Sequence, residues 1–212
     1  MASNHWGTSR VEAFSDGVFA IAITLLVLDI SVPESEFDDL WRGIGDQWPS
    51  YLAYVTSFSA IGGMWLSHHG IFRRLQAVND PVMRINLLLL MAVGFLPFPT
   101  RLAAEAIGND DAERAAVIFY GLTLVLIALL FRVLWGAIMR DRDLLLPDVD
   151  DEEIRYISRR TTPNIVFYFW ATALAVVRPN AAAILYLVIA VMAVIRAPGS
   201  GRRPRGVAAA AD

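Results

Sequence analysis

Long apolar stretches separated by short polar ones dominate the pattern of this chain. Six of them cover residues 11–32, 51–72, 85–102, 115–139, 163–177 and 181–195. None alternates apolar and polar residues, so the pattern predicts helices and not the strands of a membrane barrel. A helix needs about 20 apolar residues to cross a bilayer, and the last two stretches are shorter than the others. We therefore predict an all-α, polytopic membrane protein with six transmembrane helices, and leave open whether helices five and six span completely.

Proline and charged residues mark the ends of these stretches. Pro33 ends the first, and Arg178-Pro179-Asn180 joins the fifth to the sixth as a helical hairpin. Within the third, Pro97 and Pro99 stand two residues apart, which a regular helix does not accommodate. We predict that this helix kinks or ends there. The charged residues 141–160 are expected to form a solvated connector, which can include a short surface helix.

Composition supports a membrane location. The chain of 212 residues is 56% hydrophobic and 18% charged, whereas soluble domains carry about 25% charged residues. It contains no cysteine, and all its basic residues are arginine. These absences exclude disulfides, thiolate metal sites and lysine-based chemistry.

The arginines indicate the orientation in the membrane, because basic residues collect on the cytoplasmic side. With the N-terminus inside, thirteen of the eighteen arginines are cytoplasmic, four are outside (Arg42, Arg101, Arg114 and Arg178), and Arg132 lies within the fourth helix. The proposed outer loops, 34–46 and 105–113, are acidic. We therefore predict cytoplasmic termini, one six-helix domain over residues 1–197, and a basic, disordered tail over 198–212.

The first apolar stretch carries an acid at each end. Only twelve residues, none of them charged, separate Asp16 from Asp29. At 100° per residue one helix face carries a small residue and then mostly apolar ones; they are Gly17, Ile21, Thr24, Leu25 and Leu28. Ser15 and Asp16 point away from this face. Packing against neighbouring helices is one interpretation of the face, and a specialised role is the other.

Polar residues gather at the cytoplasmic ends of the first three helices. They are Arg10, Ser15, Asp16, His68, His69 and Asn86. At similar depth they can form one hydrogen-bonded cluster, because ionisable groups inside membranes find partners. Interfacial anchoring, together with Trp65, is the alternative. Adjacent histidines diverge by about 100° on a helix, so a zinc site is not favoured and no cofactor is expected.

Several short motifs resemble those of the transmembrane protein 175 family of potassium channels, in its bacterial form. The resemblance starts at Arg10-x-x-x-Phe14-Ser15-Asp16 and continues through Gly17–Ile30, Trp65, His68-His69, Phe72, Asn86-Leu87 and residues 96–100. It implies six-helix subunits in the plasma membrane, with cytoplasmic termini and one repeat per chain. Four copies would form a homotetramer, with the first helix of each lining a central pore.

Site residues follow from the same resemblance. It places the narrowest ring of the pore at Ile21, with Thr24 or Leu25 next and Leu28 beyond. It assigns a structural network that holds the pore helices to Arg10, Phe14, Ser15, Asp16, Trp65, His68 or His69, and Asn86. Asp29 would stand at the outer pore mouth and attract cations by its field.

The implied function is a potassium-permeable cation channel, whose partners are K⁺, other copies of the chain and the lipid bilayer, with no nucleic acid. A carbonyl selectivity filter is excluded because no Thr-Val-Gly-Tyr-Gly sequence occurs. The alternative is a proton-coupled secondary transporter that uses His68 or His69 with Asp16, although no inverted repeat is visible. An enzyme is least supported, because no nucleophile–base pair or phosphate loop is found.

Overall fold

The computed structural model describes the backbone of residues 7–195 and their side chains, except those of 156 and 159–164. The predicted tail, 198–212, lies outside the described residues. The helices are α1 (Thr8–Leu25), α2 (Leu40–Asp46), α3 (Trp48–Phe72), α4 (Asp80–Phe95), α5 (Pro97–Glu105), α6 (Asp110–Arg140), α7 (Asp151–Ala175) and α8 (Pro179–Ile195). Three 3₁₀ turns accompany them: η1 (Leu26–Asp29), η2 (Glu34–Asp39) and η3 (Arg142–Leu144).

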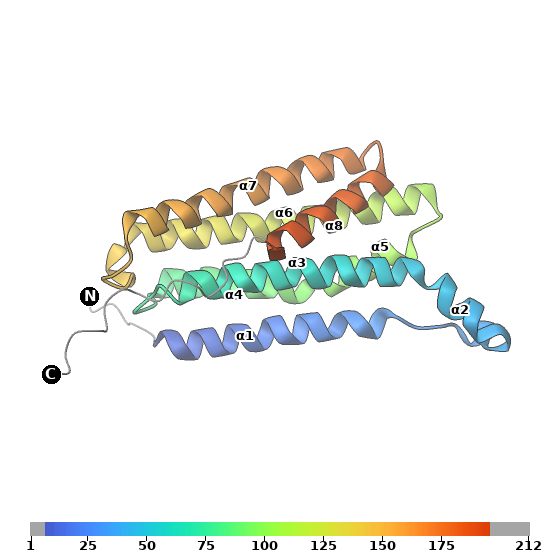
Figure 1. Cartoon of the computed structure of the whole chain (residues 1–212), viewed down its shortest axis with the longest axis horizontal. Coiled ribbons are helices and arrows are strands. Elements are labelled where there is room, and N and C mark those ends of the chain that lie inside the picture. The colour runs from blue at the N-terminus through green and yellow to red at the C-terminus, as the bar shows by residue number, and fades with distance from the viewer. Residues whose placement is uncertain (1–6, 196–212) are drawn as a thin grey trace.

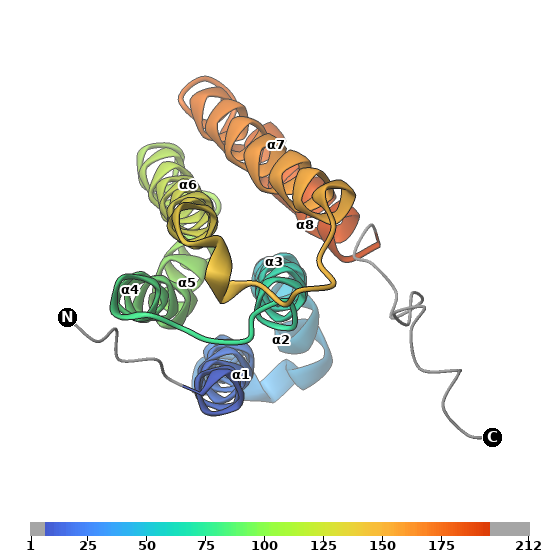
Figure 2. The same cartoon turned by 90° about the vertical axis from the view of Figure 1, so that its left-hand side faces the viewer.

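The long helices lie side by side as one bundle (Figures 1 and 2). Helix α1 occupies one edge and packs against α3 and α4. Helices α7 and α8 form the opposite edge, where α7 packs against α6 and α8 against α3. Among the described residues no strand is formed, so the all-α prediction is confirmed there.

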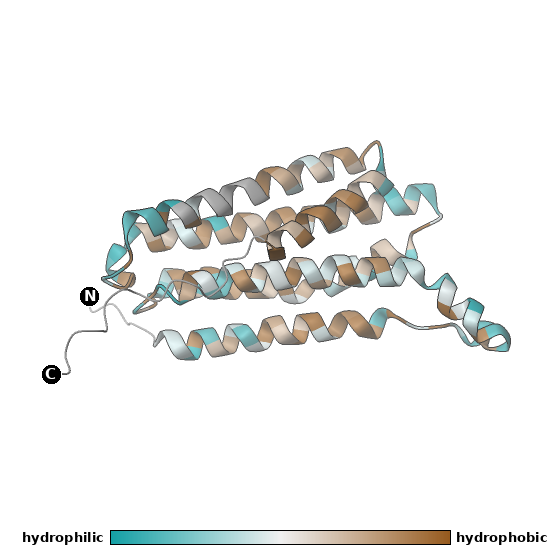
Figure 3. Cartoon of the chain, in the orientation of Figure 1, coloured by the Kyte–Doolittle hydropathy of each residue, from teal (hydrophilic) through white to brown (hydrophobic). Residues whose placement is uncertain are grey.

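Within residues 7–195, three segments are long and apolar enough to cross a membrane: Thr8–Asp29, Asp80–Glu105 and Asp110–Arg140. Two shorter apolar helices, Ile165–Ala175 and Pro179–Ile195, stand beside them. Figure 3 shows hydrophobic residues along the middle of the long helices and hydrophilic ones concentrated at the bundle ends and around α2. Six complete spans therefore remain a prediction.

The two prolines of the third apolar stretch act as predicted. Helix α4 ends at Phe95 and α5 begins at Pro97, so both Pro97 and Pro99 fall in the first turn of α5. Backbone N–H groups in a first turn have no partner within the helix, so a proline there removes no hydrogen bond. The break lies inside the apolar segment that α4 and α5 form together, and it changes the direction of the chain there.

The predicted connector over residues 141–160 is not a loop in its second half, where the helix is the start of the long α7 and not a short separate surface helix. Helix α7 starts at Asp151, because the Asp150 side chain accepts a hydrogen bond from the Glu153 backbone N–H. The acids of its first turn also suit the positive end of the helix dipole. The first half is not freely solvated either, since Leu144 and Leu145 are buried. The segment 34–46, predicted as an outer loop, contains η2 and α2.

The connector is held against the turn between α3 and α4. Leu75 and Leu145 form an isolated backbone bridge, and the Gln76 backbone N–H donates to the Leu144 carbonyl at 2.9 Å. Arg74 adds an ion pair with Glu153 at 3.3 Å. One end of the bundle is thus tied together across residues far apart in the sequence.

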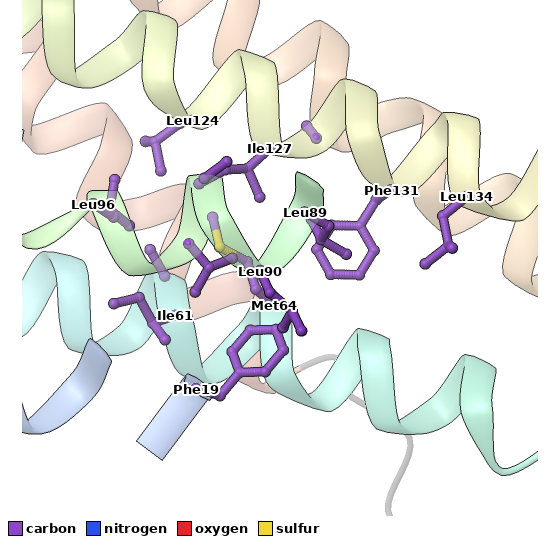
Figure 4. Packing of buried hydrophobic residues seen from close by; sticks show 14 of the residues in the cluster. Phe19, Ile61, Met64, Leu89, Leu90, Leu96, Leu124, Ile127, Phe131 and Leu134 are labelled. Carbon is purple, nitrogen blue, oxygen red and sulfur yellow. The ribbon is translucent and has the colours of Figure 1, made fainter. Parts of the chain in front are cut away.

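A continuous apolar core joins α1, α3, α4 and α6 (Figure 4). Phe19 of α1 reaches toward Met64 of α3 and Leu90 of α4, and Ile127 of α6 closes the core from the other side. Inside a bilayer such contacts act through close packing, because lipid is as apolar as the core. This packing holds one side of α1 in place.

Gly121 of α6 is the tightest point between α6, α7 and α8. The Tyr186 hydroxyl donates to Thr172 Oγ1 at 3.0 Å, and a Cβ on Gly121 would overlap both oxygens. We expect Gly121→Ala to lower the free energy of unfolding by about 1–3 kcal/mol, through overpacking and disruption of this hydrogen bond. Denaturant unfolding in detergent measures it. Gly94→Ala, where the added Cβ meets nothing within 4 Å, is the matched control, and an equal loss in both variants contradicts the prediction.

Candidate functional site

Helix α1 has one buried face and one exposed face. The buried face, formed by Val11, Ser15, Phe19, Ala22 and, in η1, Leu26, follows helical spacing and contacts α3 and α4. The face singled out from the sequence is the exposed one. Within the single chain, Ile21 is 61% exposed and Leu28 72%, and Gly17, Thr24 and Leu25 are exposed as well. This apolar face is therefore left to lipid, to another copy of the chain, or to a pore.

The Thr24 hydroxyl is oriented by its own helix. It donates a hydrogen bond to the Ile21 carbonyl at 2.9 Å. Because the hydroxyl hydrogen is donated to the backbone, the oxygen lone pairs remain free to accept on the exposed side. Just beyond, the chain tightens into η1, which keeps Leu28 on the exposed side.

On the buried side, three polar side chains from three helices form a hydrogen-bonded network. His68 Nε2 of α3 lies 2.8 Å from Asn86 Oδ1 of α4, and Asn86 Nδ2 donates to Ser15 Oγ of α1 at 3.1 Å. Ser15 Oγ in turn donates to the Val11 carbonyl at 2.8 Å. All three side chains are fully buried. We call Ser15, His68 and Asn86 the polar brace, because it joins α1 to α3 and α4.

The hydrogen-bond directions in the polar brace determine the histidine tautomer. Since Asn86 Nδ2 donates to Ser15, Asn86 Oδ1 is the acceptor and His68 Nε2 carries the hydrogen. The His68 ring stacks on Phe72 with centroids 4.2 Å apart and tilts against Phe19 at 5.3 Å. Its Nδ1 is buried with no hydrogen-bond partner among the described residues. His68, not His69, is thus the histidine bonded to Asn86, and aromatic rings flank it.

A second pair of contacts joins α1 to α3 beside the polar brace. Trp65 Nε1 donates to Asp16 Oδ1 at 2.8 Å, so Asp16 points toward α3 and away from Ile21. His69 Nδ1 lies 2.7 Å from Glu12 Oε1, within ion-pair distance but without hydrogen-bond angles. The Trp65 and His69 rings stack at 5.6 Å.

Sequence reasoning missed Glu12, although a signal for it exists. Glu12 and Asp16 are four residues apart, as are Trp65 and His69, so each pair shares one helix face. The first two apolar stretches, α1 and α3, run antiparallel. A residue early in α1 therefore lies beside a residue late in α3. The antiparallel pairing of Glu12 with His69 and Asp16 with Trp65 follows from that spacing.

Comparison with known proteins identifies the family. Residues 10–97, which contain most of α1, all of α3 and α4, and the polar brace, match the family model described as endosomal/lysosomal potassium channel TMEM175. A protein named potassium channel from Streptomyces collinus is 49% identical over 144 residues, covering 68% of this chain and 70% of that protein. Another, from Chamaesiphon minutus, is 42% identical over 171 residues, covering 79% and 84%. The chain is a bacterial member of the TMEM175 family.

A solved structure supports this assignment over nearly the whole chain. The crystal structure described as a lysosomal potassium-selective channel TMEM175 homolog from Chamaesiphon minutus superposes with a TM-score of 0.82 at 37% identity. The match covers 91% of this chain and 98% of that one. The TMEM175 family consists of ion channels and not of enzymes, and this member is a membrane protein with several apolar helices.

Three predicted site residues lie apart from the polar brace. Arg10 and Phe14 are exposed, and no hydrogen bond or ion pair of the described residues joins Arg10 to the brace. Asp29 is partly exposed at the far end of η1, within electrostatic reach of Arg101 and Glu105 of α5. These two form an ion pair at 2.7 Å. Arg101 and Glu105 act on Asp29 with opposite signs, so the three groups together keep one net negative charge.

Proposed function

We propose that the protein is a potassium-permeable channel of the cell membrane, built from four copies with α1 of each lining a central pore. The exposed apolar face of α1 is the observation that carries this proposal. Its opposite face is held by the polar brace and by packing, so the exposed face is presented rigidly. The relatives named potassium channels support the choice of ion.

Other copies of the chain are required because α1 lies at the edge of its own bundle (Figure 2). A path along the Ile21–Leu28 side is enclosed only when equivalent helices complete a ring, as cyclic symmetry allows. The small Gly17 below Ile21 leaves the inner end of this path wide. The narrowest ring then falls at Ile21, with Thr24, Leu25 and Leu28 above it.

Selectivity in this proposal comes from partial dehydration. A ring of Ile21 side chains offers no polar ligand, so a passing ion sheds part of its water, which costs less for K⁺ than for the more tightly hydrated Na⁺. Thr24 oxygens, whose lone pairs remain free, replace some of that water just beyond the ring. Dewetting of the same apolar stretch closes the pore.

The orientation follows from charge. Arg73, Arg74, Arg84, Arg140 and Arg142 all belong to the bundle end where α1 begins, and we place that end in the cytoplasm. The acidic segment of η2 and α2 then lies outside. Asp29 contributes to the outer mouth together with Arg101 and Glu105.

A flux assay in liposomes tests the function. We expect the reconstituted protein to carry potassium down its gradient, with no pH gradient imposed and no flux in protein-free liposomes. Strict dependence on an imposed proton gradient would contradict the channel and favour the proton-coupled transporter. The polar brace favours the channel over the transporter. The His68 ring is buried and flanked by Phe19 and Phe72, so it is poorly placed to exchange protons with water.

A further inference from the structure

Helix α6 carries an arginine beside an otherwise apolar outer stripe. The stripe consists of exposed side chains at helical spacing, namely Phe119, Leu122, Leu126, Leu129 and Val133. Arg132 lies at its edge and is exposed. Among the described side chains, no hydrogen bond or ion pair engages its guanidinium. Ionisable groups in membrane helices are rare and take partners, so this one points to a ligand outside the chain.

The depth of Arg132 matches the boundary between acyl chains and headgroups. Helix α6 has 31 residues, about 46 Å, whereas the hydrocarbon core is about 30 Å thick. A centred helix therefore leaves about five residues outside at each end, which places the boundary close to Trp135. The Arg132 backbone lies roughly 5 Å inside that boundary, within reach of a long side chain.

The side chain extends toward that boundary. Arg132 Nη1 lies 3.9 Å from the position that a Cβ on Gly136 would occupy, one turn closer to the end of α6. Gly136 has no side chain to fill this space, so the guanidinium lies along the helix with its donors free. Arg140, also exposed, stands eight residues beyond Arg132, about 12 Å along α6 and about 80° around it, so two long side chains can reach one phosphate between them.

We propose that Arg132 and Arg140 form a binding site for the phosphate of an anionic phospholipid, whose acyl chains lie along the apolar stripe. A guanidinium binds two phosphate oxygens with parallel hydrogen bonds, which an ammonium does not match. An acidic side chain of a second copy is the competing occupant. It is less favoured because Arg132 lies inside the hydrocarbon boundary beside the apolar stripe, which acyl chains of a lipid can cover together with the guanidinium. The inference does not depend on ion conduction.

Native mass spectrometry of the detergent-solubilised full chain tests this site. The protein is mixed with phosphatidylglycerol or with phosphatidylcholine, and retained lipid is measured for the unaltered protein, Arg132→Gln and Arg114→Gln. Arg114 stands at the other end of α6, so its replacement removes the same charge from the same helix. We expect Arg132→Gln to retain phosphatidylglycerol roughly tenfold less, as for the loss of one charged hydrogen bond, and Arg114→Gln to retain it normally.

Three results overturn the proposal. The first is equal phosphatidylglycerol retention by Arg132→Gln and the unaltered protein. The second is equal retention of phosphatidylcholine and phosphatidylglycerol by the unaltered protein. The third is a smaller oligomeric mass for Arg132→Gln with unchanged lipid retention, which would assign Arg132 to a contact between copies. Arg132→Lys keeps the charge without the planar donor pair, and we expect it to bind at an intermediate level.

Discussion

Replacing Ile21 with asparagine is expected to lower the ratio of potassium to sodium permeability toward unity. The amide gives a passing ion polar contacts where the Ile21 side chain gives none, so the dehydration that distinguishes the two ions is reduced. The amide also wets the apolar stretch, which raises the conductance. Reversal potentials recorded in planar bilayers, with potassium on one side and sodium on the other, measure the ratio.

Ile184 of α8 provides a matched control for Ile21. It is 60% exposed, almost the same as Ile21 at 61%, but lies on a helix at the opposite edge of the bundle. Ile184→Asn makes the same change in hydrophobicity and should leave the permeability ratio unchanged. If Ile21→Asn conducts with an unaltered ratio, the constriction lies elsewhere on the chain.

The sequence predicts the helices and the two faces of α1 because both depend on local periodicity. A side chain every 100° divides α1 into a stripe containing Phe19 and a stripe containing Ile21, whatever the rest of the fold. The paired prolines predict the break between α4 and α5 for a similarly local reason. Such features need no knowledge of which helices are neighbours.

Features that depend on contacts between distant segments are harder to predict. Charge density suggested that residues 141–160 are solvated, yet Leu145 pairs with Leu75 across seventy positions of chain. The polar brace is an intermediate case. The sequence groups Ser15 with Asn86 because both lie at a similar depth in their helices. Only the packing of the helices shows that His68, and not His69, bonds to Asn86. Arg10 shares that depth and yet points out of the bundle, because the turn of the helix carries it to the exposed side.

Asn86→Ala is expected to destabilise the fold strongly. The amide accepts from His68 and donates to Ser15, so its loss removes both interhelical hydrogen bonds of the polar brace at once. A hydrogen bond between membrane helices contributes about 0.6 kcal/mol on average, but an unsatisfied buried donor costs about 1–3 kcal/mol. We therefore expect the free energy of unfolding in mixed micelles to fall by roughly 2 kcal/mol.

Asn180 supplies the control for this prediction, because it is exposed at the start of α8 and its replacement by alanine should change stability little. A double-mutant cycle with Ser15→Ala then separates the hydrogen bond from general loosening. If Asn86 acts through Ser15, the double variant loses less free energy of unfolding than the sum of the losses in the two single variants. The second change then removes a side chain that has already lost its hydrogen-bond partner. Strict additivity would mean that the two side chains stabilise α1 independently. The polar brace would then be a pair of separate contacts, and α1 would be held chiefly by the packing of Phe19.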